Sequence, residues 1–169
     1  MNNDNVSGDY DFFVLSETFR MLITNPELIF QLLNVFPMPV QVFAPDGMLV
    51  FSNRAFLEIN NVTDVNLIVG VYNLLNDPVC DELYGHDLLE KAFQGETISW
   101  TETISMPIQD LINRGVVKER PYESAFASAV LFPIWDDGKV VCVVNIFNFR
   151  EVYRGQPDVA KAKEYIDHH

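Results

Sequence analysis

The stretch VQVFAPDGMLVFSNRAF, residues 40–56, decides the fold. Two short runs of strand-forming residues flank a Pro-Asp-Gly turn, in which Gly47 can take the positive φ that tight strand connections require. Asn53 then opens a helical pattern, because its side-chain oxygen can accept a hydrogen bond from a backbone N–H of the first helical turn. The stretch therefore predicts a β-hairpin followed directly by a helix.

Composition limits the classes of protein to which the chain can belong. Its 169 residues suit one domain, and 49% hydrophobic content predicts a packed core. The net charge of −13 opposes direct binding to nucleic acid or to an anionic membrane. The apolar runs are shorter than the about 20 residues that span a bilayer, and Met1 begins no apolar signal sequence. Two distant cysteines predict no disulfide framework and no metal site. We expect a cytoplasmic protein with no membrane partner.

Helical patterns precede and follow the hairpin. Asn25 and Pro26 restart the first pattern as cap and first helical residue, and its apolar face is wide enough to cover a sheet or to pair with a second copy of the chain. A later pattern begins at Asp77-Pro78 and ends at Gly95. The expected helices occupy residues 16–36, 54–60, 64–68 and 77–93.

Three strands are expected in the second half of the chain, over residues 97–106, 125–135 and 139–149. The last two are joined by a second hairpin at Asp137-Gly138. Residues 108–124 are expected to form a polar, solvated insertion with one helical turn. This order predicts an α+β fold, a five-stranded antiparallel sheet with short helices on one face and flanking helices at the N-terminus.

The motifs resemble the PAS family of sensor domains in their order and spacing. The matching pieces are the Asp46-Gly47 hairpin, Asn53 with Ala55, Gly70 four residues before Leu74, the helix ending at Gly95, and the Asp137-Gly138 hairpin. Asn148 to Glu151 stand where many family members carry an Asp-Ile-Thr-Glu junction to an output module. The resemblance implies a PAS-like sensor over residues 37–151, preceded by a tail and dimerisation helices over 1–36. It also implies that the protein binds a small molecule and forms a homodimer.

The C-terminal segment carries a second resemblance. Residues 159–169, with Tyr165-Ile166 and a histidine three residues later, resemble the first helix of an AraC-type helix-turn-helix domain. A plain terminal helix is the alternative. The resemblance implies that residues 152–169 are a linker and the start of an output helix. The chain would then be the sensory part of a transcriptional regulator, which contacts DNA only through a domain outside this sequence.

No catalytic constellation is visible in the sequence, so we expect a binding module and not an enzyme. The candidate ligand-binding residues are Asn53, Tyr72, Trp100, Glu102 and Asn145. Glu102 interrupts the apolar positions of its strand, and a buried carboxylate there needs a partner unless a bulge turns it outward. Asn145 interrupts an apolar strand in the same way, and a buried amide needs hydrogen-bond partners.

Two alternative functions remain open at this point. One is a dimerisation or protein-interaction module that binds no ligand. The other is a haem sensor, because His86 lies in the segment where the resembling oxygen-sensing PAS domains carry their iron ligand, and a neutral imidazole can bind iron. A surface histidine is the simpler interpretation, so no cofactor is expected.

Overall fold

The computed structural model describes residues 17–78, 80–81, 85–104 and 109–154, without the side chains of 17–19, 102–104 and 109–110. The predicted tail at 1–15 and the predicted helix at 159–169 lie outside the described residues. The chain divides into two units, Met1–Leu33 and Asn34–His169. No helix of the described part is long and apolar enough to cross a membrane.

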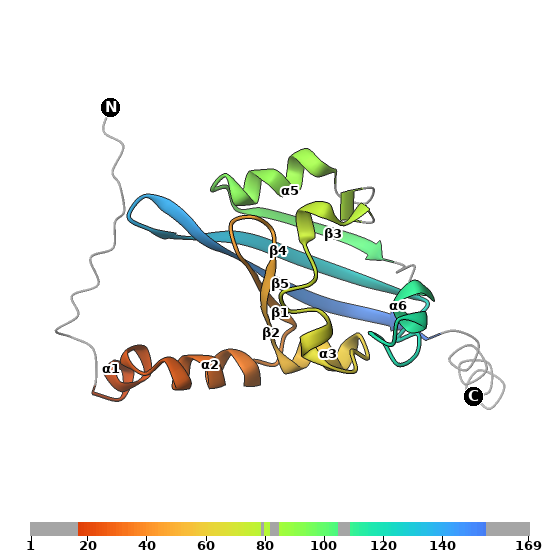
Figure 1. Cartoon of the computed structure of the whole chain (residues 1–169), viewed down its shortest axis with the longest axis horizontal. Coiled ribbons are helices and arrows are strands. Elements are labelled where there is room, and N and C mark those ends of the chain that lie inside the picture. The colour runs from red at the N-terminus through yellow and green to blue at the C-terminus, as the bar shows by residue number, and fades with distance from the viewer. Residues whose placement is uncertain (1–16, 79, 82–84, 105–108, 155–169) are drawn as a thin grey trace, which may run out of the picture. The chain divides into compact units, whose positions relative to one another are not determined.

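The first unit contains the predicted pair of helices, drawn in red and orange in Figure 1. These are α1 (Glu17–Thr24) and α2 (Pro26–Val35), which continues two residues past the unit boundary. Asn25 caps α2 as predicted, because the N–H of Glu27 donates to its Oδ1 at 3.0 Å. No residue of α2 is buried, and Phe30 and Leu32 are exposed. Part of the apolar surface of the helix is therefore exposed.

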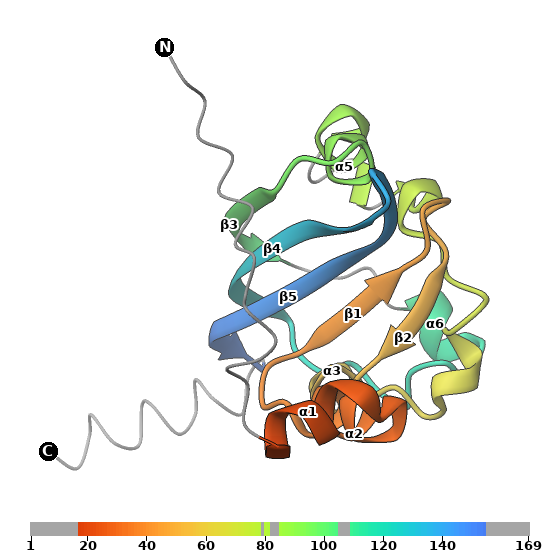
Figure 2. The ribbon, with the colours of Figure 1, turned by 90° about the vertical axis from the view of Figure 1, so that its left-hand side faces the viewer.

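The second unit is built on the predicted five-stranded antiparallel sheet, whose strand order is β2-β1-β5-β4-β3 (Figure 2). The strands are β1 (Val40–Phe43), β2 (Leu49–Ser52), β3 (Ile98–Ile104), β4 (Ser124–Asp136) and β5 (Lys139–Tyr153). The predicted entry hairpin is confirmed, with Gly47 at φ +85°. The first and last strands of the chain therefore pair in the middle of the sheet.

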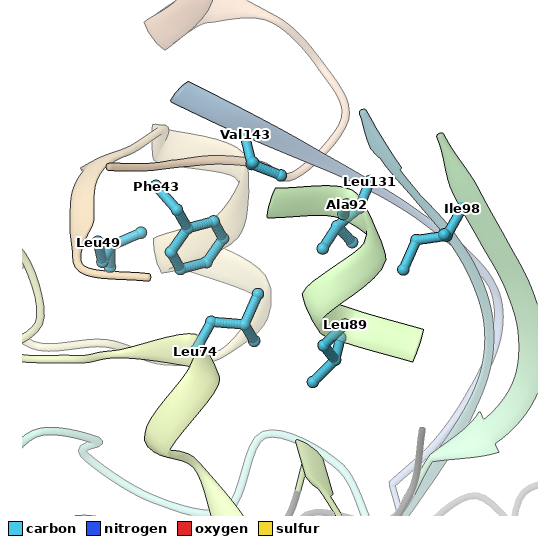
Figure 3. Packing of buried hydrophobic residues seen from close by; sticks show 8 residues of the cluster. All are labelled: Phe43, Leu49, Leu74, Leu89, Ala92, Ile98, Leu131 and Val143. Atoms are coloured by element: carbon cyan, nitrogen blue, oxygen red, sulfur yellow. The ribbon is translucent and has the colours of Figure 1, made fainter. Parts of the chain in front are cut away.

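The helices of this unit pack against one face of the sheet. They are α3 (Arg54–Ile59), η2 (Val65–Leu67), η3 (Leu74–Asn76), α5 (His86–Phe93) and α6 (Gln109–Asn113). Figure 3 shows Leu89 and Ala92 of α5 and Leu74 of η3 converging with Phe43 and Val143 of the sheet. Because Phe43 and Val143 are paired neighbours on adjacent strands, their side chains share a face, and that face carries the core.

Two sequence predictions need correction. The helix expected over 77–93 is not continuous, because Gly85 has φ +78° and α5 begins only at His86. The insertion at 108–124 is more than a solvated loop, since Val116, Val117 and Tyr122 are buried. Most residues of that segment are polar, so its composition did not indicate that these three residues are buried.

Asn53 joins the entry to β1 with the start of α3. Its Oδ1 accepts from the N–H groups of Val40 at 2.9 Å and Phe56 at 3.1 Å. Its Nδ2 donates to the carbonyls of Phe36 at 3.1 Å and Met38 at 2.8 Å. The predicted helix cap is thus confirmed, and the same fully buried side chain also fixes the chain that leads into the sheet.

Asn53→Ala is expected to lower the free energy of unfolding by about 2–4 kcal/mol, because it removes a helix cap and leaves buried backbone groups unpaired. Urea unfolding followed by circular dichroism measures the change. Asn66→Ala is the matched control, since Asn66 is exposed and bonds only within its own turn. The control is expected to cost less than about 0.5 kcal/mol. Equal losses in the two variants would contradict the role given to Asn53.

Candidate functional site

A row of polar side chains crosses the inner face of the sheet. Gln41 of β1 pairs with Ser52 of β2 on one side and with Asn145 of β5 on the other. Directly opposite residues in antiparallel strands point to the same face, and this row is two residues along from the core pair Phe43 and Val143. The three side chains therefore face the helices, and they are only 4%, 4% and 2% exposed.

Two atoms of this row lack any hydrogen-bond partner in the structure, Ser52 Oγ and Asn145 Oδ1. Two other buried amides in the same unit are bonded. Asn53 uses both ends of its amide, and Asn60 accepts from the Tyr122 hydroxyl at 3.3 Å and donates to the Phe56 carbonyl at 3.0 Å. A buried polar atom without a partner is unfavourable, and in native proteins it commonly marks a site for water, an ion or a ligand.

Aromatic side chains lie beside the polar row. Phe147 is the next inward residue of β5 after Asn145, and its ring lies 5.9 Å from that of Phe56 on α3. Phe149 follows at 6.1 Å from Phe147, and its ring lies 5.9 Å from that of Tyr122. The polar row is therefore bordered by a packed aromatic series that runs from α3 to the insertion.

The ligand-binding residues predicted from the sequence have different surroundings. Asn145 lies in the polar row. Trp100 packs at the edge of the core, opposite Ala129. Glu102 lies opposite Ala127 in the register of β3 and β4, and its side chain is outside the described part. All four hydrogen-bonding positions of the Asn53 side-chain amide are occupied by backbone groups. Asn53 therefore has no position left with which to bond a ligand.

Gln41 and Ser52 were not singled out from the sequence. Strict alternation in the segment VQVF offered the signal, because Phe43 is an obvious core residue and Gln41, two positions earlier, must share its face. A polar residue between two valines is commonly assigned to the solvent-facing side of a strand. The local pattern therefore does not indicate that Gln41 is buried.

Tyr72 belongs to a second polar group, at the edge of the core. Its hydroxyl donates to Asp77 Oδ2 at 2.8 Å and lies 3.5 Å from Cys80 Sγ. The thiol of Cys80 lies 3.6 Å from the same carboxylate oxygen. Burial raises the pKa of Tyr72 well above its ordinary value, and the nearby thiol and carboxylate raise it further. Burial raises the pKa of Cys80 to about 12, so both groups are neutral at physiological pH.

His86 lies at the start of α5 and is about half exposed. Its Nε2 is 3.0 Å from Glu90 Oε1, and its Nδ1 is 3.5 Å from Asp81 Oδ1. Within the described ranges, no three His, Cys, Asp or Glu side chains gather closely enough to hold a metal ion.

Neither the protein-family models nor the curated proteins contain a match to this sequence. Solved structures do match. The PAS domain of an HTR-like protein from Haloarcula marismortui gives a TM-score of 0.50 at 12% identity, covering 79% of this chain and 98% of that one. The LOV protein of Rhodobacter sphaeroides gives 0.53 at 14% identity, covering 82% and 74%.

VqmA of Vibrio cholerae, a dimer described among the LuxR-type receptors, gives a TM-score of 0.52 at 12% identity. The match covers 73% of this chain and 50% of VqmA, so the chain spans half the length of that receptor. A structure of VqmA bound to DPO gives 0.51. Together these likenesses establish that the chain has the PAS fold that the sequence predicted.

The raised pKa of Cys80 predicts slow thiol chemistry in the folded protein. Only the thiolate is nucleophilic, and at pH 8 a thiol of pKa about 12 is ionised to about 1 part in 10⁴. We expect Cys80 in the Cys142→Ser variant to react with iodoacetamide at least about 100-fold more slowly when folded than in urea. Peptide mass spectrometry measures both rates. The folded rate should rise about tenfold per pH unit from pH 8 to 10, and comparable rates in the two states would contradict this.

Proposed function

We propose that the chain is a sensory domain that binds a small organic molecule between the sheet and the helices. The observation that carries the proposal is the buried polar row of Gln41, Ser52 and Asn145, two of whose atoms have no partner within the protein. A core that needed only stability would place apolar residues there, because an unsatisfied polar group is costly and an apolar replacement is not. A ligand bonded to this row repays that cost.

The proposed output is regulation of transcription through a DNA-binding domain outside this sequence. The resemblance of residues 159–169 to an AraC-type helix supports this output, although those residues lie outside the described part. VqmA, which shares the fold, supplies a precedent for joining it to a DNA-binding function. Strand β5 offers a direct connection, because it carries Asn145 and continues to Tyr153, near the end of the described residues.

The proposed assembly is a homodimer through the N-terminal helices. Leu32 and Val35 of α2 are exposed apolar residues, and a second copy of the same helix would bury them. A ligand that favoured one packing of the sheet against the terminal segments would then shift the placement of two attached output domains.

Small-molecule binding is tested on the purified chain after exposure to an extract of its source cells. Native mass spectrometry is expected to show the mass of the protein plus one bound molecule per chain, and the melting temperature is expected to rise. If no such mass appears and no metabolite set shifts the melting temperature, the chain is a ligand-free interaction module. A Soret band in the visible spectrum of the same sample would instead support haem, with His86 as the candidate ligand.

Deleting residues 1–33 is expected to convert the dimer into a monomer, because α1 and most of α2 are removed. The deletion retains Asn34, whose Oδ1 accepts from the Arg54 N–H at 3.2 Å, and Phe36, whose carbonyl bonds to Asn53. Multi-angle light scattering measures the mass of both proteins, and circular dichroism checks that the deletion variant folds. A folded variant that stayed dimeric would rule out these helices as the interface.

A further inference from the structure

We infer that the molecule bound at the polar row is uncharged and carries at least one N–H or O–H group that donates a hydrogen bond to Asn145. This inference rests on the proposed small-molecule function and specifies the chemistry of the ligand. Three features of the described residues lead to it, namely the absence of buried charge, the identity of the unpartnered atoms, and the apolar surroundings of Asn145.

The buried polar residues carry no charge. The buried polar residues of the described part are Gln41, Ser52, Asn53, Asn60 and Asn145, and none of them is ionisable near neutral pH. An ion taken out of water is strongly destabilised unless a counter-charge or several hydrogen bonds meet it. A carboxylate, phosphate or ammonium group would find no counter-charge among these residues. An uncharged group therefore suits the part of the ligand that meets the polar row.

The unpartnered atoms define the polar edge of the ligand. Asn145 Oδ1 is a carbonyl oxygen and can only accept, whereas Ser52 Oγ can donate or accept. The ligand must therefore present a donor to Asn145 and can present either kind of group to Ser52. The two residues stand on β5 and β2 with β1 between them, so their backbones are about 10 Å apart. Gln41 lies between them in the same row.

The neighbours of Asn145 are apolar, so they suit an apolar part of the ligand next to its polar edge. Asn145 pairs with Leu131, which is fully buried, and its inward neighbours along β5 are Val143 and Phe147. The ring of Phe147 already packs near that of Phe56. An aromatic molecule with an amide-like or hydroxyl edge matches both sets of neighbours, because aromatic rings pack favourably side by side and an amide meets an amide with complementary bonds.

The first test measures how much Asn145 destabilises the ligand-free protein. Asn145→Leu is expected to leave the urea midpoint unchanged or to raise it, because it removes a buried polar atom that lacks a partner. Asn53→Leu, at an equally buried but fully bonded asparagine, is expected to lower the midpoint clearly. Asn148→Leu, on an exposed position of the same strand, is the neutral control. If Asn145→Leu lowered the midpoint as far as Asn53→Leu does, Asn145 would be scaffold and the inference would fail.

The second test uses several aromatic acids with one or two rings. Three forms of each acid are compared as probes. These are the primary amide, which is neutral and donates; the N,N-dimethyl amide, which is neutral without a donor; and the carboxylate, which is charged. Calorimetry is expected to give the primary amide the highest affinity, about tenfold or more above the other two, which is the effect of one hydrogen bond. Asn145→Leu is expected to remove that preference, while Asn148→Leu keeps it.

The outcomes separate this inference from the function on which it rests. Tighter binding of the carboxylate, equal binding of the dimethyl amide, or an unchanged preference in Asn145→Leu overturns the inference and leaves small-molecule sensing intact. If no probe binds but native mass spectrometry finds a bound molecule, the charge and donors of that molecule decide the matter. If no molecule of any class binds, the proposed function fails together with the inference.

Discussion

The buried amide of Asn53 is the interaction on which the second unit depends. It holds the carbonyls of Phe36 and Met38, the N–H of Val40 and the first turn of α3 at one point. That point fixes where β1 starts and the direction in which the chain leaves β2. Because β1 pairs with β5, the last strand of the chain lies beside the segment that this contact holds. One side chain thus connects the hairpin to the middle of the sheet.

The second unit holds two kinds of buried polar residue, which differ in their hydrogen bonding. Asn53 and Asn60 are bonded at both ends of their amides, so they stabilise the fold. Ser52 and Asn145 each carry a buried atom without a partner, which is unfavourable for the stability of the fold. The two kinds sit next to each other at Ser52 and Asn53. Scaffold and site are therefore distinguished by hydrogen bonding, and burial alone does not separate them.

Local chemistry explains which features could be predicted from the sequence. Gly47 and Asn53 act on backbone groups within a few residues of themselves, so their roles as turn and helix cap could be predicted. The alternating strand patterns likewise predicted the five-stranded sheet. The break at Gly85 could not be predicted, because a glycine inside a helical pattern has no local signal for its φ. Val116, Val117 and Tyr122 were missed because their burial depends on partners such as Ile68 and Asn60, far away in the chain. The row of Gln41, Ser52 and Asn145 also forms only when three strands pair.

Strand β5 gives the site a physical connection to the rest of the domain. Its successive inward residues serve different purposes: Val143 packs in the core, Asn145 stands in the polar row, and Phe147 and Phe149 join the aromatic series that ends at Tyr122. Phe149 and Val152 pack in turn on the cluster of Tyr122 and Ala125, close to where the strand ends. Interiors are close-packed, so a molecule placed against Asn145 cannot displace Phe147 without moving its ring neighbours. In the proposed sensor, a ligand would bias the end of β5 only by the difference in its affinity for two such packings. We therefore expect its signal to begin in the packing around Asn145 and Phe147.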